Sequence, residues 1–218
     1  MARPIDADAE ETRRKLVDAA LEQFAERGFH GVSNRDLAAA ARVNAAVISF
    51  YFGGKQGLYD AAVDEVYRRL RDRIMQAALA VEPAAKRRSK SALLLPGPRG
   101  PVELDALVES LYHAARAERS GVRLLVRQVL DHGRLTLRTE QRHFLPGTES
   151  FTELLASALG VPAGRARLAV IALSYLLSRY VVQDDASLSA ALGAPTHAEA
   201  HRRVVASLTA TARAHLEK

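Results

Sequence analysis

Apolar side chains recur at helical spacing through most of this chain. In the first segment, one face of a helix at the spacing i, i+3, i+4 and i+7 is formed by Val17, Ala20, Leu21 and Phe24. No useful run alternates apolar and polar residues at the two-residue period of a strand, and there is no internal repeat or glycine-rich phosphate loop. The sequence therefore predicts an all-α fold.

The composition is that of a globular protein with a buried core, since 48% of the 218 residues are hydrophobic and 26% are charged. The absence of cysteine excludes disulfide frameworks, thiolate zinc sites and iron–sulfur clusters. The N-terminus lacks the apolar run of a secretory signal. The longest nearly apolar stretch, residues 168–182, is shorter than the ~18 residues of a membrane span. We therefore expect a cytoplasmic protein with no membrane partner.

The net charge of +6 is compatible with a polyanionic partner but does not locate one. Residues 1–58 hold eight Lys or Arg and eight Asp or Glu, so the whole surplus lies in residues 59–218. Its clusters are Arg68, Arg69, Arg71 and Arg73 on one helix, and Lys86, Arg87, Arg88, Lys90 and Arg99 in a proline-rich stretch. A solvated helix face, a disordered linker and a nucleic-acid site all fit these clusters.

Two short helices near the N-terminus have the dimensions of a helix-turn-helix. The first opens at Ser33, with Asp36 as its capping partner, and runs to about residue 41. After a turn of about three residues, Asn44 is a favourable N-cap for a helix over residues 45–51, which a glycine pair ends. In a helix-turn-helix the second helix enters the major groove of DNA. An ordinary antiparallel helical hairpin fits the same pattern.

The rest of the chain suggests a connecting helix, a linker and a helical domain. Residues 82–101 are rich in Pro, Gly and charge, which predicts a flexible linker or disordered loop. We predict a helix-turn-helix domain over 1–58, connecting helix over 59–81 and C-terminal domain over 102–218. In that last domain, one helical face is predicted for Val122, Leu125, Val126, Val129 and Leu130. Helical pieces follow near 134–143 and 148–159, then an apolar helix over 163–183 and a last helix that Thr196 caps.

The stretch from about Glu11 to Tyr67 resembles the DNA-binding domain of the TetR family of transcriptional regulators. Three motifs carry the resemblance: F-x-x-x-G-F at the end of the first helix, S-x-R-D-L-A in the second, and Y-F-x-x-K-x-x-L leading into the fourth. The resemblance covers about a quarter of the chain. It implies a DNA-binding domain followed by a helical domain that binds a small ligand and dimerises.

The resemblance also implies which residues contact DNA. The candidates for the phosphate backbone are Ser33, Arg35, Arg42, Asn44, Tyr51 and Lys55. Those that face bases are Ala45, Ala46, Ser49 and Phe50. The chain departs from the family at three points: Arg42 stands where glycine is frequent, Ala45 and Ala46 replace Lys and Gly, and Ser49 replaces Tyr. Arg42 either adds a phosphate contact or occupies a permissive turn, and Asn44 either only caps its helix or also reaches a phosphate.

Polar and aromatic residues within the apolar C-terminal helices are candidates for a ligand pocket. They are Tyr112, His113, Arg116, Arg127, Gln128, His132, Phe144, Phe151, Tyr175 and Arg179. For any one of them, packing or exposure to solvent is the favoured explanation. A guanidinium among apolar residues needs an anionic partner, which the protein or an acidic ligand can supply.

No arrangement of residues suggests catalysis. His197 and His201 have the i, i+4 spacing of metal ligands, but the zinc-protease motif needs Glu directly after the first His. Glu199 is explained instead as the capping partner of Thr196. We therefore expect no enzyme, metal or cofactor. A helical adaptor that binds only proteins would leave the helix-turn-helix without a role.

The family resemblance implies a DNA-binding repressor that a small-molecule inducer releases from a palindromic operator. The helix over 163–183 is apolar on nearly all sides, so it needs a second partner besides its own domain. The last helix offers a stripe formed by Val204, Val205, Leu208 and Ala212. The family resemblance implies that the last two helices meet their copies. We therefore expect a homodimer through helices 163–183 and 197–215.

Overall fold

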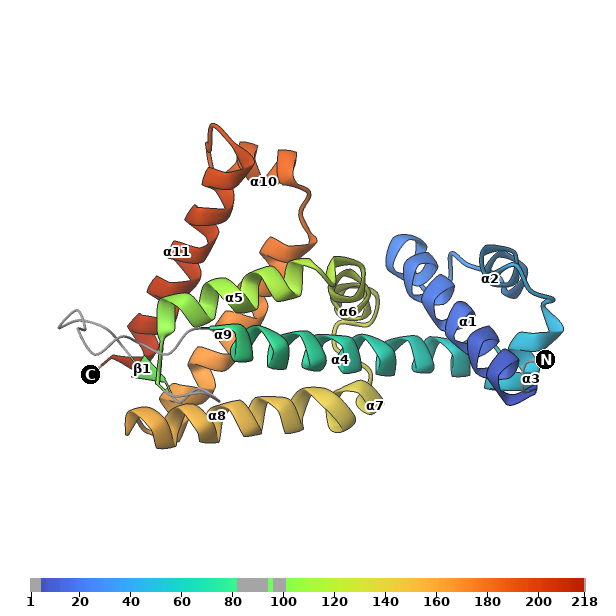
Figure 1. The fold of residues 1–218 in the computed structure, drawn as a ribbon, viewed down its shortest axis with the longest axis horizontal. Helices are drawn as coiled ribbons and strands as arrows, with labels where there is room; N and C mark the ends of the chain where they lie inside the picture. The colour runs from blue at the N-terminus through green and yellow to red at the C-terminus, as the bar shows by residue number, and fades with distance from the viewer. Residues whose placement is uncertain (1–4, 82–93, 96–100, 218) are drawn as a thin grey trace. The chain divides into compact units, whose positions relative to one another are not determined.

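The computed structural model describes residues 5–81, 94–95 and 101–217 of the chain and forms two compact units. The first unit comprises residues 1–69 and 120–139, and the second comprises residues 70–119 and 140–218. The predicted all-α fold is confirmed in the described part (Figure 1). The division at residues 58, 81 and 101 stays a prediction, and the predicted linker lies outside the described residues except at Leu94, Leu95 and Pro101.

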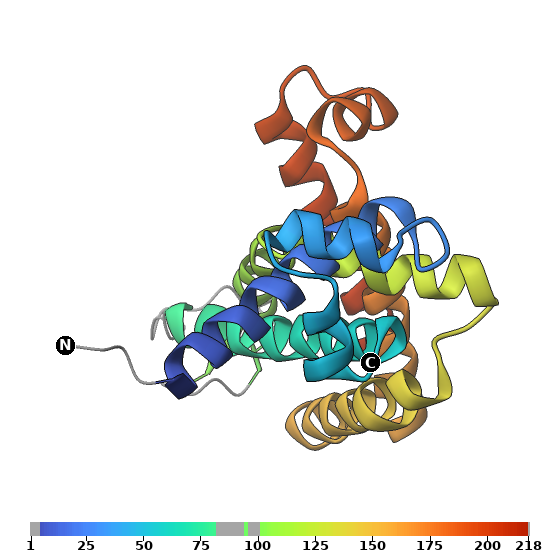
Figure 2. The ribbon, with the colours of Figure 1, turned by 90° about the vertical axis from the view of Figure 1, so that its right-hand side faces the viewer.

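The first unit is built from helices alone in the described residues. They are α1 (Ile5–Arg27), α2 (Asn34–Ala41), α3 (Ala46–Phe52), the first part of α4 (Lys55–Ala80), most of α6 (Arg119–His132), and α7 (Leu137–Thr139). Helix α2 packs against α1 and contacts α3, and the three helices lie together in both views of the ribbon (Figures 1 and 2).

The core of the first unit follows the predicted apolar spacing. Phe24 of α1, Leu37 of α2, Ile48 of α3 and Leu58 of α4 are all completely buried. The ring of Phe24 meets that of Tyr59 edge-on, with 5.0 Å between ring centroids. Each short helix thus contributes one apolar anchor, which fixes the face that it turns away from the core.

The predicted capping box at the start of α2 is confirmed. The hydroxyl of Ser33 accepts a hydrogen bond from the backbone N–H of Asp36 at 3.1 Å, and the carboxylate of Asp36 accepts one from the N–H of Ser33 at 2.8 Å. The N–H and the hydroxyl of Ser33 both donate to the carboxylate of Asp36, and these two bonds hold the pKa of Asp36 below its usual value. The beginning of α2 is therefore set by its local sequence.

The second unit combines helices with one small strand pair. Its elements are the end of α4, β1 (Leu94–Leu95), β2 (Val102–Glu103), α5 (Leu104–Arg116), the π-helix η1 (Glu140–Phe144), α8 (Leu145–Leu159), α9 (Ala163–Val182), α10 (Asp185–Ala191) and α11 (His197–Leu216). The strands pair antiparallel, with Leu94 opposite Glu103. Helix α10 was not predicted, although Asp184 caps it by accepting a hydrogen bond from the N–H of Ser187 at 2.8 Å.

The predicted face of α6 is wrong in part. Val122 is buried as expected, but Leu130 is 77% exposed and Val129 is 40% exposed. Leu124 and Gln128, which were not assigned to the inner face, are each 1% exposed. The helix is therefore rotated from the position that its apolar spacing suggests, because packing inside the first unit selects a face that includes an amide.

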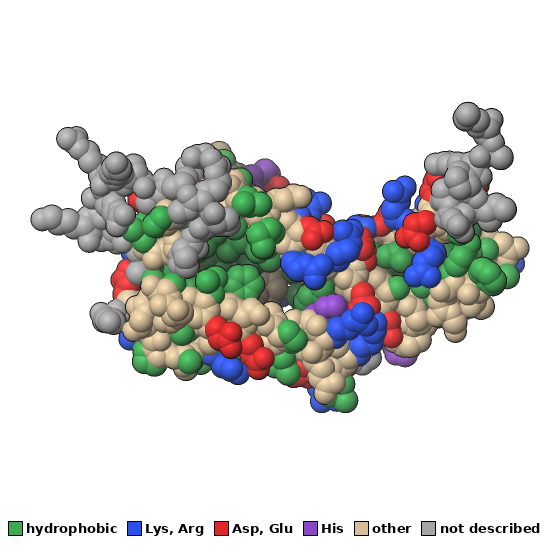
Figure 3. Space-filling model, turned by 60° about the horizontal axis from the view of Figure 1, so that its bottom comes forward, with side chains coloured by type: hydrophobic (Ala, Val, Ile, Leu, Met, Phe, Trp, Pro, Cys, Tyr) green, Lys and Arg blue, Asp and Glu red, His purple; other side chains and the backbone are tan. Residues whose placement is uncertain are grey.

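The last helices differ from the prediction in where their apolar faces go. Helix α11 packs against α9 and α5 of the same chain. Its stripe through Val204, Leu208 and Ala212 is at most 2% exposed, so the prediction that this stripe meets a second copy is wrong. Helix α9 instead exposes Leu168 and Tyr175, and hydrophobic side chains of the second unit reach the surface in several patches (Figure 3). Within the described residues, no helix is long and apolar enough to cross a bilayer.

Candidate nucleic-acid interface

The turn between α2 and α3 is built on a residue in the left-handed conformation. Arg42 has φ 57° and ψ 45°, and it is the one non-glycine residue with positive φ in the part of the chain that the structure describes. Its N–H donates to the carbonyl of Ala39 at 3.1 Å, and the N–H of Val43 donates to that of Ala38 at 2.9 Å. Such a residue ends a helix sharply, so α3 starts a few residues later in a new direction.

Helix α3 begins with the side chain of Asn44 as its cap. The amide oxygen of Asn44 accepts a hydrogen bond from the N–H of Ala46 at 2.9 Å, although the backbone N-cap position is Ala45. Because Ile48 is completely buried, the opposite face of the helix points outward. The exposed side chains on this face of α3 are those of Ala46, Ser49 and Phe50, and Ala45, directly before the helix, is exposed as well.

The end of α3 is tied to α1 through the backbone and an aromatic ring. A guanidinium N–H of Arg13 donates to the carbonyl of Tyr51 at 3.4 Å, and the same guanidinium lies 5.1 Å from the ring centroid of Phe52. Tyr51 and Phe52 are both half-buried. The aromatic pair is therefore held partly by packing.

Lys55 is the first residue of α4, directly after two glycines with positive φ. Its ammonium lies 4.4 Å from the ring centroid of Phe29, a cation–π contact that holds it at this end of the helix. No acidic residue stands in the first turn of α4. Ser33, Arg35 and Arg42 are exposed. All ten predicted DNA contacts thus lie within one compact unit, on α2, the turn, α3 and the start of α4.

The predicted ligand residues are divided between the two units. Arg127, Gln128 and His132 belong to the first unit, whereas the other seven belong to the second. Arg127 finds its partner in the protein, since it donates to the carbonyl of Glu26 at 2.6 Å. Gln128 is buried, with no partner for Nε2 among the described residues, and the side chain of His132 lies outside those residues. In the second unit Phe144 is half-buried, while Phe151, Tyr175 and Arg179 are exposed.

Three of the predicted ligand residues join a polar network that connects α5, α10 and α11. The hydroxyl of Tyr112 lies 2.7 Å from Nδ1 of His201, and Nε2 of His201 lies 3.4 Å from a carboxylate oxygen of Asp185. Arg116 pairs with Asp185 and donates to the carbonyl of Gln183 at 2.6 Å. The ring of His113 lies 5.3 Å from that of Tyr112. Burial lowers the pKa of His201, and Asp185 opposes that shift.

Sequence reasoning considered His201 only as a metal ligand beside His197. The structure gives each histidine a different partner, because Nδ1 of His197 lies 2.8 Å from the hydroxyl of Ser189 while His201 faces Tyr112. Among the residues that the structure describes, no group of three His, Cys, Asp or Glu side chains is placed to hold a metal ion. Nothing in the sequence indicates the role of Asp185 except its position directly after Asp184, which caps α10.

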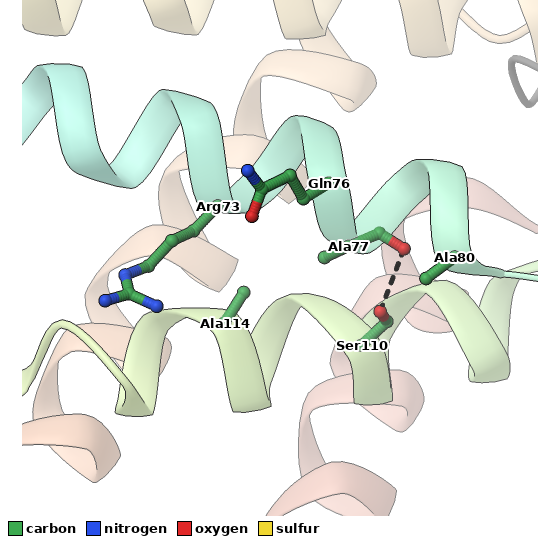
Figure 4. Close-up of a pocket in the computed structure, with 6 residues that line it drawn as sticks. All are labelled: Arg73, Gln76, Ala77, Ala80, Ser110 and Ala114. Carbon is green, nitrogen blue, oxygen red and sulfur yellow. Dashed lines mark hydrogen bonds between the residues drawn. The ribbon is translucent and has the colours of Figure 1, made fainter.

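A shallow groove of roughly 280 Å³ lies between α4 and α5 in the second unit (Figure 4). Its lining consists of Arg73, Gln76, Ala77, Ala80, Ser110 and Ala114. The hydroxyl of Ser110 donates to the carbonyl of Ala77 at 3.0 Å, and Arg73 donates to the carboxylate of Glu118 at 3.0 Å. None of the predicted ligand residues lines this groove, and both of these polar side chains already have partners within the protein.

The N-terminal part of the chain is similar to known proteins. Residues 16–62 match the model of the bacterial regulatory proteins of the tetR family. The "Probable HTH-type transcriptional regulator YttP" of Bacillus subtilis (strain 168) is 45% identical over 56 residues, which are 26% of this chain and 27% of that protein. The HTH-type transcriptional regulator BetI of Escherichia coli O127:H6 is 33% identical over 82 residues, which are 38% of this chain and 42% of BetI. These matches therefore span less than half of either relative.

Solved structures extend the likeness to the whole fold. A TetR-like transcriptional regulator from Rhodococcus sp. RHA1 has a TM-score of 0.60 at 20% identity and covers 100% of both chains. A TetR-family transcriptional regulator from Streptomyces coelicolor has a TM-score of 0.64 at 19% identity, covering 95% of this chain and 97% of that one. The N-terminal helix-turn-helix domain of this chain thus belongs to the tetR family of bacterial regulatory proteins, on a chain with the all-helical fold of TetR-family regulators.

Proposed function

We propose that this protein is a ligand-responsive DNA-binding transcriptional regulator, a repressor that binds a palindromic operator as a homodimer. The observation that carries the proposal is the exposed face of α3, which follows the left-handed turn at Arg42 within the stretch that matches the family model. A short helix anchored by one buried residue, with its outer face uncovered, has the arrangement that enters a major groove. The relatives are named transcriptional regulators rather than enzymes, so we propose no catalytic activity.

The contacts with the DNA backbone come from Tyr51 on α3 and from residues on either side of that helix. Arg35, Arg42 and Lys55 supply cations, and the hydroxyl of Tyr51 supplies a hydrogen bond; Ser33 and Asn44 add short polar contacts. Cations that neutralise phosphates release counterions, so binding falls as salt rises. These contacts position the protein on the duplex without reading its sequence, which is left to α3.

The dimer is formed by the outer faces of α9 and α11, within residues 163–183 and 197–215. Leu168 is 58% exposed and Tyr175 is 64% exposed on α9, and Ala206 and Ala210 are exposed on α11. Because small residues on α11 allow close approach, a second copy can cover the exposed Leu and Tyr. A two-fold protein presents two recognition helices and so suits a palindromic operator.

An inducer acts through the second unit. The network of Tyr112, Arg116, Asp185 and His201 offers hydrogen-bond donors and acceptors on α5, α10 and α11. A small acidic molecule that rearranges these helices changes the geometry of the dimer. Helix α4 contributes residues to both units and therefore links them along the chain. Inducer and DNA then weaken each other's binding by the same factor.

The test is a mobility-shift titration of the full chain on a DNA fragment from its own promoter. Lys55→Ala is expected to weaken binding to every sequence alike and to lower the slope of log affinity against log salt by about one unit for each phosphate that Lys55 neutralises. Lys15→Ala removes the same charge from α1, where Lys15 pairs with Glu11 at 2.9 Å, and should leave the slope unchanged. A well-folded Lys55→Ala variant with the wild-type slope removes Lys55 from the interface.

A screen of small carboxylic acids against the shifted complex tests the inducer. An acid that releases the DNA should bind the free protein more tightly than it binds the complex, by the factor with which it weakens DNA binding. If no fragment of the promoter is shifted at low salt, the proposed function is wrong.

A further inference from the structure

The exposed face of α3 has very little hydrogen-bonding chemistry. The helix reads AVISFYF, so it contains neither a charged residue nor Asn, Gln or His. Of the side chains on its exposed face, Ser49 alone carries a polar group. Guanine is read most often by a bidentate Arg or Lys, and adenine by a bidentate Asn or Gln. Helix α3 lacks all four of these residues.

The side-chain amide next to α3 is engaged in capping that helix. A bidentate contact to adenine uses both the oxygen and the nitrogen of a side-chain amide. The amide oxygen of Asn44 is already the acceptor for the N–H of Ala46, at 2.9 Å. The cations of this region, Arg35 and Arg42, lie on α2 and in the turn rather than on α3. Direct readout by α3 must therefore use other chemistry.

Phe50 is the most exposed large apolar side chain in the described part of the chain, at 81%. Its ring contacts the ring of Tyr51 edge-on, with 5.0 Å between the ring centroids. Ala46 lies one helical turn before Phe50, so the two share a face and form a small apolar strip. Covering this exposed ring with another apolar group removes apolar surface from water, which is favourable.

Resting on the proposed function, we propose that α3 reads its operator through the 5-methyl groups of thymine, which Phe50 and Ala46 contact. The major groove presents one apolar group, the thymine methyl, and Phe and Ala are side chains that meet it. Cytosine methylated at C5 presents the same group at the same edge. The operator is therefore discriminated at α3 by methyl groups, and the hydroxyl of Ser49 contributes the remaining hydrogen bond.

The experiment removes single methyl groups from the DNA. Duplexes that the full chain retains are enriched from a random-sequence pool, and affinities are measured by fluorescence anisotropy. Each thymine of the enriched duplex is then replaced in turn by uracil, which differs only in lacking the 5-methyl group. At one or two positions in each half-site, uracil should weaken binding about fourfold for each methyl group removed. Replacing that thymine by 5-methylcytosine should weaken binding less than replacing it by cytosine.

Matched variants assign the effect to Phe50. Phe50→Ala should bind the thymine and uracil duplexes equally at one of these positions, whereas Ser49→Ala should keep the wild-type ratio between them. Because Phe50 is exposed, the variant should unfold at the wild-type temperature. Uracil tolerated at every position of a specifically bound duplex overturns the inference while DNA binding stands. Failure to enrich any duplex overturns the proposed function and this inference together.

Discussion

At the turn between α2 and α3, Arg42 combines backbone strain with an exposed charge. Its left-handed φ of 57° costs a residue with a Cβ about 1 kcal/mol relative to glycine. We expect Arg42→Gly to raise the free energy of unfolding in urea by up to about 1 kcal/mol, and to lower DNA affinity with a salt slope reduced by about one unit. Arg42→Ala removes the same charge and keeps the strain, so it should lose affinity without gaining stability. Full DNA affinity in both variants would show that the arginine only occupies the turn.

Among the elements of the second unit, α5, α10 and α11 are joined through His201, which faces Tyr112, Asp185, Arg116, His113 and the nearby His197. Burial lowers the pKa of His201 from 6.5, so the folded state releases a proton that the unfolded state holds. The free energy of unfolding is therefore highest above pH 6.5, and it falls as the pH drops below 6.5 and through the lower pKa of the folded state. Urea denaturation across this range should show a steeper loss in the wild type than in His201→Gln, which cannot titrate. Equal slopes for wild type and His201→Gln would contradict the prediction.

For the whole molecule, the structure separates residues that hold the chain together from those available to a second copy. Tyr175 is 64% exposed on α9, so Tyr175→Glu should fold normally, sediment as a monomer and bind operator DNA weakly. Leu208 is 2% exposed within its own chain, so Leu208→Glu buries an unpaired carboxylate and should cost several kcal/mol of stability. Leu130→Glu, on α6, changes a side chain that is 77% exposed and serves as the control for added charge. A dimeric Tyr175→Glu variant with full DNA affinity would rule out the outer face of α9 as the interface.

Local features of the chain were determined by the sequence itself. Three helix caps are examples: the capping box of Ser33 and Asp36, the Asn44 cap and the Thr196 cap. Each hydrogen bond joins residues two or three positions apart, so it needs no partner from a distant part of the chain. The apolar face of α1 was equally readable, because only one stripe of that helix is apolar. The motifs around the helix-turn-helix, which the family model also matches, belong to this local information.

The tertiary structure decided which of several competing faces is buried. Helix α6 buries Gln128 and exposes Leu130, although the apolar spacing favoured the opposite. The stripe through Leu208 is used inside the chain, and the contact of Tyr112 with His201 joins residues 89 positions apart. Periodicity shows that a helix has an apolar face, but a helix with apolar residues on several sides satisfies more than one packing. The choice among them depends on partners distant in the sequence, and these are brought together only when the whole unit folds.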